Sequence, residues 1–237
     1  MAAILEIEQL ESGFGEVQVL WGVSLQVQAG RLTTLIGANG AGKTTTLRTI
    51  MGSVRPWGGR VFLHGENVTK LSPHKKASRG LVLVPEGRQL FPDMSVEENL
   101  EMGAYSRRAR NRQKGNLAWV YDLFPRLKER RKQKSRTLSG GEQQMLATGR
   151  GLMQEPAVLM IDELSLGLAP VLAQQLFLTL KTLRNQGLTI IMVEQNVHLA
   201  LALSDYTYVL AEGRVTIQGE SRQVAGMDEV RRAYLGL

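Results

Sequence analysis

The sequence contains no cysteine and no long hydrophobic run. Without cysteine, disulfide bridges and thiolate metal sites are excluded, and the three scattered histidines form no ligand cluster: His64, His74 and His198. No hydrophobic run approaches the roughly 18 residues that a membrane-spanning helix needs. The N-terminal stretch MAAILEIEQL carries glutamates where a signal peptide would carry lysine or arginine. We therefore expect a protein without transmembrane segment or signal peptide that stays in the cytosol.

Positive charge is in excess, and the excess is local. The chain has 29 Lys and Arg against 22 Asp and Glu, a net charge of +7. Between Arg107 and Arg136 there are 12 basic residues and only two acids, Asp122 and Glu129. Three interpretations remain open: a solvated helical face, a surface beside an anionic membrane or membrane partner, and a nucleic-acid patch. Composition alone does not choose between them.

Hydrophobic patterning predicts an α/β fold. The segments VSLQVQ and GRVFLHG, in the first 65 residues, alternate as half-exposed antiparallel strands do. Later hydrophobic runs suit strands covered on both faces, in a mainly parallel sheet: 81–84, 158–161, 189–193 and 207–210. Helices are expected over 142–154 and 170–186. We expect one domain, residues 1–237, with an N-terminal antiparallel β subdomain.

A polar, helical block interrupts the alternation of strands and helices between residues 95 and 136. It begins at Ser95, a good N-cap, with Glu98 three residues later as in a capping box. We interpret this block as an inserted α-helical subdomain covering about 88–137.

The stretch GANGAGKT, residues 37–44, matches the phosphate-loop pattern G-x-x-x-x-G-K-S/T. It follows a strand candidate and opens a helix candidate, TTTLRTIMG, which Gly52 would close. Glycines let the backbone N–H groups fold inward around phosphate oxygens, and the helix N-terminus adds partial positive charge. Lys43 would reach the β- and γ-phosphates, and the Thr44 hydroxyl would hold Mg²⁺. The sequence therefore predicts a nucleotide site: Gly37, Ala38, Asn39, Gly40, Ala41, Gly42, Lys43, Thr44 and Thr45.

A second motif, VLMIDE at 158–163, has the form of a strand that ends in two acids. Asp162 would hold the Mg²⁺ shell, and Glu163 could orient or deprotonate an attacking water. Acidic pairs after strands are also common as helix caps. The pairing with a phosphate loop favours the interpretation as a Walker B strand.

The stretch LSGGEQQ, residues 138–144, resembles the signature motif of ABC-type ATPases. The three motifs occur in the order and spacing of that family, so the resemblance implies a P-loop NTPase core of the ABC type, with ATP and Mg²⁺ as cofactors. Ser139, Gly140 and Gly141 precede a helix from Glu142 onward and would form a phosphate-receptive N-terminus. In the family this N-terminus faces the γ-phosphate on the opposite subunit, so that two ATP molecules lie between two subunits.

The resemblance assigns further residues. Phe14 lies where the family stacks an aromatic ring on adenine, although an ordinary core position is the alternative. Glu86, in VPEGR, stands where most members have a glutamine that senses Mg²⁺ and water. Gln195 stands at the switch position that is usually histidine. In the loop after Walker B, Leu164 and Ala169 replace the usual Pro and Asp.

Within the family, the chain is most similar to the shorter ATPase subunit of branched-chain amino-acid importers, through VPEGR, LFPRLKERR, DELSLGLAP, VEQN and VRRAYLGL. That resemblance implies a peripheral protein at the cytoplasmic face of the membrane, whose helical insertion docks on a permease. A second, longer ATPase would complete a heterodimer, with a homodimer as the alternative, and an extracytoplasmic binding protein would deliver the substrate. Urea, amides and other amino acids remain open as substrates.

Two other classes of function are compatible with parts of the sequence. An ABC ATPase that acts on DNA or ribosomes would fit the charge, but Lys43 and Ser139 are only 96 residues apart, which leaves no room for a coiled coil. Zinc-binding cysteines of repair relatives are absent, so we expect no nucleic-acid partner. A subunit with little hydrolysis would fit Glu86, Ala169 and Gln195, but Glu163 argues against it. We expect Gln195 to sense the γ-phosphate without acid–base work, and Glu194 to point away from it.

Overall fold

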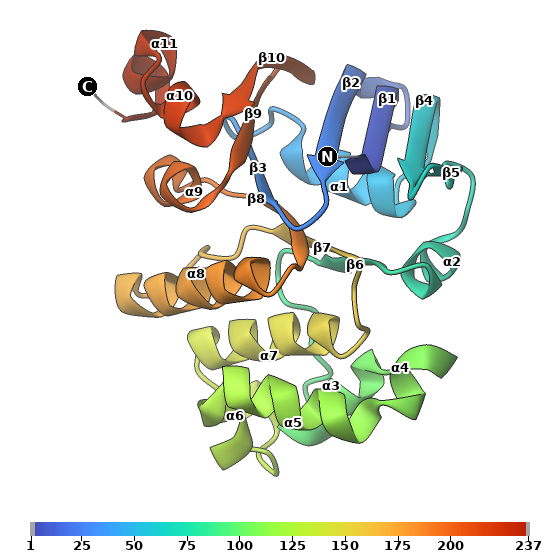
Figure 1. Cartoon of the computed structure of the whole chain (residues 1–237), viewed down its shortest axis with the longest axis vertical. Helices are drawn as coiled ribbons and strands as arrows, with labels where there is room; N and C mark the ends of the chain where they lie inside the picture. Colours follow the sequence, from blue (N-terminus) through green and yellow to red (C-terminus); the bar gives the residue numbers. More distant parts are fainter. Residues whose placement is uncertain (1–2, 236–237) are drawn as a thin grey trace.

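The computed structural model describes residues 3–235, which build two β-sheets (Figure 1). The N-terminal sheet has four antiparallel strands in the order β2-β1-β4-β5. Their bounds are β1 Ala3–Phe14, β2 Val17–Gln28, β4 Pro56–Leu63 and β5 Glu66–Asn67. The predicted antiparallel subdomain is confirmed.

The second sheet has six strands in the order β10-β9-β3-β8-β7-β6, of which all but β10 run parallel. Their bounds are β3 Leu32–Ile36, β6 Leu81–Val84, β7 Val158–Asp162, β8 Thr189–Val193, β9 Tyr206–Ala211 and β10 Arg214–Glu220. The four predicted parallel strands are present. Strand β10 was not predicted, because its residues alternate between exposed and half-buried and supply little hydrophobic signal.

The parallel sheet is covered on both faces, as its hydrophobic strands require. Strand β7 shows this: Leu159 and Ile161 face one core cluster, and Val158 and Met160 face the other. The first cluster packs against the long helices below the sheet in Figure 1, and the second fills the space toward the antiparallel sheet. The helices outside the insertion are α1 Lys43–Met51, α2 Pro73–Ser78, α7 Gly140–Leu152, α8 Pro170–Asn185, α9 Val197–Leu203, α10 Ser221–Ala225 and α11 Asp228–Val230, followed by a π-helical turn, Arg231–Leu235.

The predicted helical insertion is present, as a set of short helices packed on α7 at the lower end of Figure 1. Its capping box is confirmed: the Ser95 hydroxyl accepts from the Glu98 N–H at 3.2 Å, and the Glu98 carboxylate accepts from the Ser95 N–H at 2.7 Å. The bounds are α3 Val96–Gly103, α4 Arg107–Asn111, α5 Gln113–Leu123, α6 Pro125–Glu129 and a 3₁₀ turn, Ser135–Thr137.

The basic block lies in this insertion, and part of its charge has a local partner. Arg108 and Arg112 lie beside Glu155, and Arg130 lies 2.7 Å from Glu142. These ion pairs favour the interpretation as a helical face and reduce the charge available to a nucleic acid. Within residues 3–235, no helix is both long and hydrophobic enough to cross a bilayer.

Candidate functional site

The phosphate loop connects β3 to α1, as predicted, and its shape depends on glycine. Gly37, Gly40 and Gly42 all have positive φ, of 158°, 81° and 100°. A Cβ at Gly37 would lie 2.2 Å from the carbonyl oxygen of Leu210, and one at Gly42 would lie 2.8 Å from a methyl group of Leu20. Gly37 and Gly42 are therefore required both because a side chain would collide with neighbouring atoms and because the backbone has a positive φ.

Lys43 closes the loop from inside. Its buried ammonium donates to the carbonyl oxygens of Gly37 at 2.9 Å and Ala38 at 3.0 Å. Burial lowers the pKa of Lys43, while the charges of Glu163 and Asp162 act in the opposite direction. The side chain is thus held at the centre of the loop, where it can exchange carbonyl contacts for phosphate oxygens.

Thr44 and Asp162 meet although they are far apart in sequence. The Thr44 hydroxyl donates to Oδ1 of Asp162 at 2.8 Å, and the second carboxylate oxygen, Oδ2, is buried without a hydrogen-bond partner among the described residues. Burial raises the pKa of Asp162, the Thr44 bond opposes this, and the charge of Glu86 raises the pKa further. A hydroxyl beside an unsatisfied buried carboxylate oxygen fits Mg²⁺, which prefers hard oxygen ligands.

The described residues contain no group of three or more His, Cys, Asp or Glu side chains that could hold a metal by themselves. Mg²⁺ characteristically binds through one or two carboxylates together with substrate phosphates, so the small protein donor set fits that mode of binding.

Glu163 and Gln195 are brought together at the ends of neighbouring strands β7 and β8. The Gln195 amide donates to Oε1 of Glu163 at 2.7 Å, while Oε2 of Glu163 is buried without a hydrogen-bond partner in the described chain. Glu163 has a φ of 55°, in the left-handed region, and its N–H donates to the Val193 carbonyl at 3.0 Å. A non-glycine residue keeps this conformation only where its surroundings hold it.

Both side chains line the same hollow as the phosphate loop, with a volume of about 390 Å³. The residues that line it are Val19, Asn39, Gly40, Gly42, Lys43, Thr44, Thr45, Glu163 and Gln195. Val19 was not predicted, since a single valine in an alternating strand carries no chemical signal. The hollow thus combines a cationic loop with a carboxylate that is fixed by an amide.

Glu194, next to Gln195, points elsewhere, as expected from strand alternation. It is buried, and its carboxylate accepts from the Ser165 N–H at 3.1 Å and hydroxyl at 2.7 Å. Burial raises the pKa of Glu194. Leu164 is fully buried in the core. The loop after β7 is therefore anchored by a buried carboxylate and a buried leucine. This anchoring role of Glu194 depends on its contact with Ser165 and carries no signal in the sequence.

The signature segment is built as a helix N-terminus. Helix α7 begins at Gly140, two residues earlier than expected. The Ser139 hydroxyl accepts from the Glu142 N–H at 3.4 Å, and the Glu142 carboxylate accepts from the Ser139 N–H at 2.9 Å. Glu142 is thus engaged in the cap and in an ion pair with Arg130. The described residues that line the phosphate-loop hollow include none from this segment.

Phe14 and Glu86 are among the predicted residues that do not line that hollow. Phe14 ends β1 with 51% of its surface exposed, which excludes the alternative of an ordinary core residue. Glu86 is half-buried in the loop after β6, near enough for its charge to act on Asp162.

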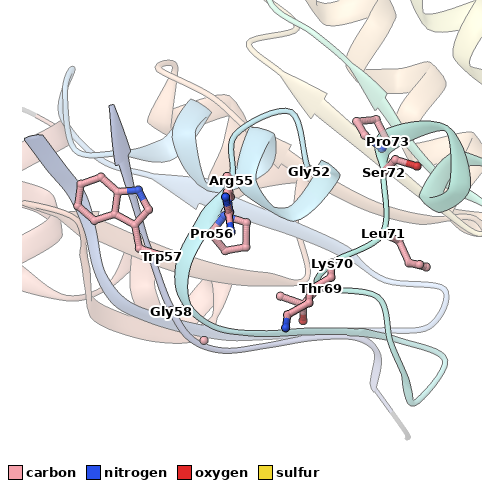
Figure 2. Close-up of a pocket in the computed structure, with 11 residues that line it drawn as sticks. Gly52, Arg55, Pro56, Trp57, Gly58, Thr69, Lys70, Leu71, Ser72 and Pro73 are labelled. Carbon is pink, nitrogen blue, oxygen red and sulfur yellow. The ribbon is translucent and has the colours of Figure 1, made fainter. Parts of the chain in front are cut away.

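A larger hollow, of about 680 Å³, lies between β4 and the segment before α2 (Figure 2). Arg55, Trp57 and Lys70 are among its lining residues, and none of the predicted site residues is. Size therefore does not identify the site; the chemistry of Lys43, Asp162 and Glu163 does. A glycine loop opening a helix, together with a Walker B carboxylate, defines a P-loop nucleotide-binding protein.

Comparison with known proteins identifies the family. A family model described as "ABC transporter" matches residues 20–165. Over 98% of the chain, the sequence is 43% identical to the high-affinity branched-chain amino acid transport ATP-binding protein BraG of Pseudomonas aeruginosa, of which 100% is covered. The chain belongs to the ABC transporter family and is an ATP-hydrolysing subunit of that family.

Two further matches support this conclusion. BraF of the same organism, also a high-affinity branched-chain amino acid transport ATP-binding protein, is 30% identical over 98% of this chain and 98% of its own. The crystal structure of an ABC transporter ATP-binding cassette in its ADP conformation superposes with a TM-score of 0.85 at 28% identity, covering 100% of both chains. The predicted fold class is confirmed.

Proposed function

We propose that this chain powers the import of branched-chain or related amino acids through a separate membrane permease. The observation that carries the proposal is the 43% identity to BraG over essentially both full lengths. The site of Lys43, Thr44, Asp162 and Glu163 supplies the chemistry that such a subunit needs.

In this proposal each residue of the site has a distinct task. The N–H groups of the phosphate loop and Lys43 bind the β- and γ-phosphates. Thr44 and Asp162 hold Mg²⁺, with Glu86 nearby, and the ion supplies charge neutralisation on the phosphates. Glu163 orients and deprotonates the attacking water. Phe14, whose ring is half-exposed at the end of β1, stacks on adenine.

Gln195 has a task that follows from its contact. Its amide N–H₂ group donates to Oε1 of Glu163 at 2.7 Å, so it fixes the orientation of the carboxylate. Because a glutamine side chain does not titrate, Gln195 cannot take a proton from the attacking water. Of these two residues, only Glu163 can act as the general base. We therefore refine the expectation from the sequence: Gln195 positions the catalytic carboxylate, and its free carbonyl oxygen is available to the water or γ-phosphate region.

The second half of the ATP site comes from another subunit. Ser139, Gly140 and Gly141 present a helix N-terminus, but they do not line the phosphate-loop hollow of their own chain. A phosphate-receptive N-terminus away from its own phosphate loop fits a site completed across a dimer. The existence of BraG and BraF as two distinct ATP-binding proteins in one organism supports a heterodimer for the relatives, and we propose the same arrangement here.

The permease would dock in a groove of about 460 Å³ between strand β6 and helices α2, α3 and α7. Its lining includes three exposed hydrophobic residues, Phe91, Met102 and Tyr105, with exposed fractions of 41%, 47% and 45%. Strand β6 is the edge of the parallel sheet, so the groove lies where no further strand covers the core. A hydrophobic groove of this kind accommodates an amphipathic helix, and it would place the chain at the cytoplasmic face of the membrane.

Affinity purification from native membranes tests this proposal. The tagged chain is expected to recover a permease, a second ATPase and an extracytoplasmic binding protein that binds branched-chain amino acids. Met102→Glu should reduce recovery of the permease while ATP hydrolysis by the purified chain persists, since Met102 does not line the nucleotide hollow. Val171→Glu, at an exposed hydrophobic residue of α8, is the matched control. Recovery of a complete exporter, or of no membrane protein at all, would contradict the proposal.

A further inference from the structure

The hollow in Figure 2 is lined by positively charged side chains and by no acidic one. Its volume is about 680 Å³, and its charged lining residues are Arg55 and Lys70. Arg60, further along β4, is paired with Glu8 at 2.8 Å. By contrast, neither the Arg55 guanidinium nor the Lys70 ammonium has an ion pair or hydrogen bond within residues 3–235. The hollow therefore presents two positive charges that the described chain does not neutralise.

A third positive charge lies behind the wall of the hollow. Helix α1 ends at Met51, and Gly52 forms part of the wall there. The C-terminus of a helix carries partial negative charge, which would repel an anion. The buried Lys76 ammonium offsets this charge: it donates to the Ile50 carbonyl at 2.6 Å and lies 3.4 Å from the position that a Cβ would occupy at Gly52. The end of α1 therefore does not oppose an anion in the hollow.

Trp57 adds an amphipathic ring to the lining. The side chain is 46% exposed, and Figure 2 shows Arg55 between Trp57 and the segment that runs from Thr69 to Pro73. Tryptophan is enriched where a membrane meets water, because its ring has a hydrophobic body and a polar N–H group. Lysine and arginine near that surface are attracted by lipid phosphates. The lining of the hollow thus combines the side chains that suit the headgroup region of a membrane.

Helix α2 separates this hollow from the groove proposed for the permease. Ser72 and Pro73, at the start of α2, line the hollow, while Ala77, near its end, lines the groove. At the end of α1, Met51 lines the groove and Gly52 lines the hollow. Figure 1 shows α2 at one edge of the molecule, between β5 and α4. A chain that docks through the groove therefore brings the hollow to the same, membrane-facing side.

The membrane side offers two kinds of partner to a basic hollow. Cytoplasmic loops of membrane proteins carry an excess of lysine and arginine, so a permease segment is a poor electrostatic match. The cytoplasmic leaflet contains anionic lipids, whose phosphates attract basic side chains close to the surface. Charge complementarity therefore favours lipid headgroups.

We propose that this hollow binds the phosphate headgroup of an anionic phospholipid, with Arg55 and Lys70 on the phosphate and Trp57 beside it. The inference rests on the proposed function, because docking through the groove is what brings the hollow toward the bilayer. The lipid contact adds to the protein contact, so that the ATPase is held at the membrane on both sides of α2.

Flotation with vesicles tests the site on the purified full chain. Vesicles contain either phosphatidylglycerol mixed with phosphatidylcholine or phosphatidylcholine alone, at an ionic strength of about 0.1 M, where long-range charge effects are screened. The wild type should bind the anionic vesicles more tightly. Arg55→Ala combined with Lys70→Ala should weaken that binding by about tenfold or more, since each basic residue near such a surface contributes about fivefold.

A matched double variant separates a site from the effect of net charge. Lys181→Ala combined with Arg222→Ala removes the same charge from another hollow, between α8 and α10, and should bind anionic vesicles as the wild type does. None of the four residues lines the nucleotide hollow, so both double variants should still bind ATP. Equal weakening in the two double variants, or no preference of the wild type for anionic vesicles, would overturn the inference.

Tryptophan fluorescence locates the contact on the chain. Anionic vesicles should shift the emission of the wild type to shorter wavelength as Trp57 leaves water. Trp57→Phe should abolish the shift, and Trp21→Phe, at another tryptophan that is 43% exposed, should retain it. A shift that persists in Trp57→Phe would place the lipid contact elsewhere and overturn the inference.

Recovery of the permease from native membranes distinguishes this inference from the proposed function. If the wild type recovers the permease but does not bind anionic vesicles, only the lipid site is contradicted. If it does neither, the proposed function is contradicted together with the lipid site. If the Arg55 and Lys70 double variant loses the permease in detergent but keeps vesicle binding, the hollow holds a protein segment and the lipid site is overturned.

Discussion

At the scale of single residues, the two residues that directly follow β8, Glu194 and Gln195, have different roles. Glu194 turns into the protein and anchors the loop after β7 through Ser165, whereas Gln195 turns outward and binds Glu163. Side chains of a strand alternate in direction, so this division could be predicted from the sequence. The hydrogen bond between Gln195 and Glu163 could not, because it depends on the register between β7 and β8 and on the left-handed backbone at Glu163.

Substitution of Lys43 tests the phosphate loop. Lys43→Ala removes the ammonium at the centre of the loop, and loss of a charge-assisted contact should weaken ATP binding by about tenfold or more. Lys70→Ala, at an exposed lysine of the hollow in Figure 2, should leave the affinity unchanged. Titration with a fluorescent ATP analogue measures both. Equal ATP affinity in the wild type and in Lys43→Ala would contradict the role of Lys43 in phosphate binding.

The contact between Gln195 and Glu163 predicts a pH effect. Gln195 carries no titrating group, so Gln195→His should introduce a dependence of kcat on pH near 6.5, the ordinary range of imidazole. The wild-type profile should lack that inflection. Steady-state hydrolysis between pH 5.5 and 8.5 would show the difference. Superimposable profiles would mean that the side chain at 195 does not act on the carboxylate.

At the scale of elements, the sequence predicted what hydrophobic periodicity and capping chemistry determine. Strands buried on both faces were found at their expected positions, and the S-x-x-E pattern located the start of α3. Helix α7 begins two residues before its expected start. The signal failed for β10, whose residues alternate between exposed and half-buried, and for the division of the insertion into short helices. Placement of Arg88 against α7 was also beyond the sequence, because it depends on tertiary contacts. The single-domain organisation stays a prediction.

Helix α2 contributes a fully buried lysine, Lys76, which caps the C-terminus of α1. The Lys76 ammonium donates to the Ile50 carbonyl at 2.6 Å, near the C-terminus of α1. Burial lowers the pKa of Lys76 from 10.5 to about 8. Between these two values the unfolded chain binds more protons than the folded chain at this position. The free energy of unfolding contributed by Lys76 therefore rises with pH across that window.

Lys76→Met removes this titration. Urea unfolding at pH 7.5 and pH 9.5 measures how the free energy of unfolding changes with pH. Between these pH values it should rise more, or fall less, in the wild type than in Lys76→Met. Lys75→Met, at the exposed neighbour in the same helix, is the matched control and should follow the wild type. An identical pH response in wild type and Lys76→Met would show that Lys76 keeps an ordinary pKa.

At the scale of the whole molecule, the site is distributed over parts that one chain does not bring together. The phosphate loop, Glu163 and Gln195 share one hollow, and the signature N-terminus does not line it. Glu163→Gln should keep ATP bound without turnover and so trap a two-subunit complex, either with itself or with the second ATPase. Light scattering in Mg–ATP should show a doubling of the 26.2 kDa chain mass in the first case. The two-subunit site would be contradicted if Glu163→Gln stays a monomer in Mg–ATP both by itself and together with the second ATPase.

We propose that Glu163 drives ATP hydrolysis in this chain, and Glu194 provides the sharpest control. Both residues are glutamates: Glu163 directly follows β7, and Glu194 directly follows the neighbouring strand β8. Glu194 is buried against Ser165, however, and does not line the nucleotide hollow. The decisive measurement is kcat of the purified chain in Mg–ATP for the wild type, Glu163→Gln and Glu194→Gln. Loss of a general base should lower kcat by about 100-fold or more in Glu163→Gln with ATP affinity retained, while Glu194→Gln stays active. Hydrolysis that survives Glu163→Gln would show that Glu163 is not the general base.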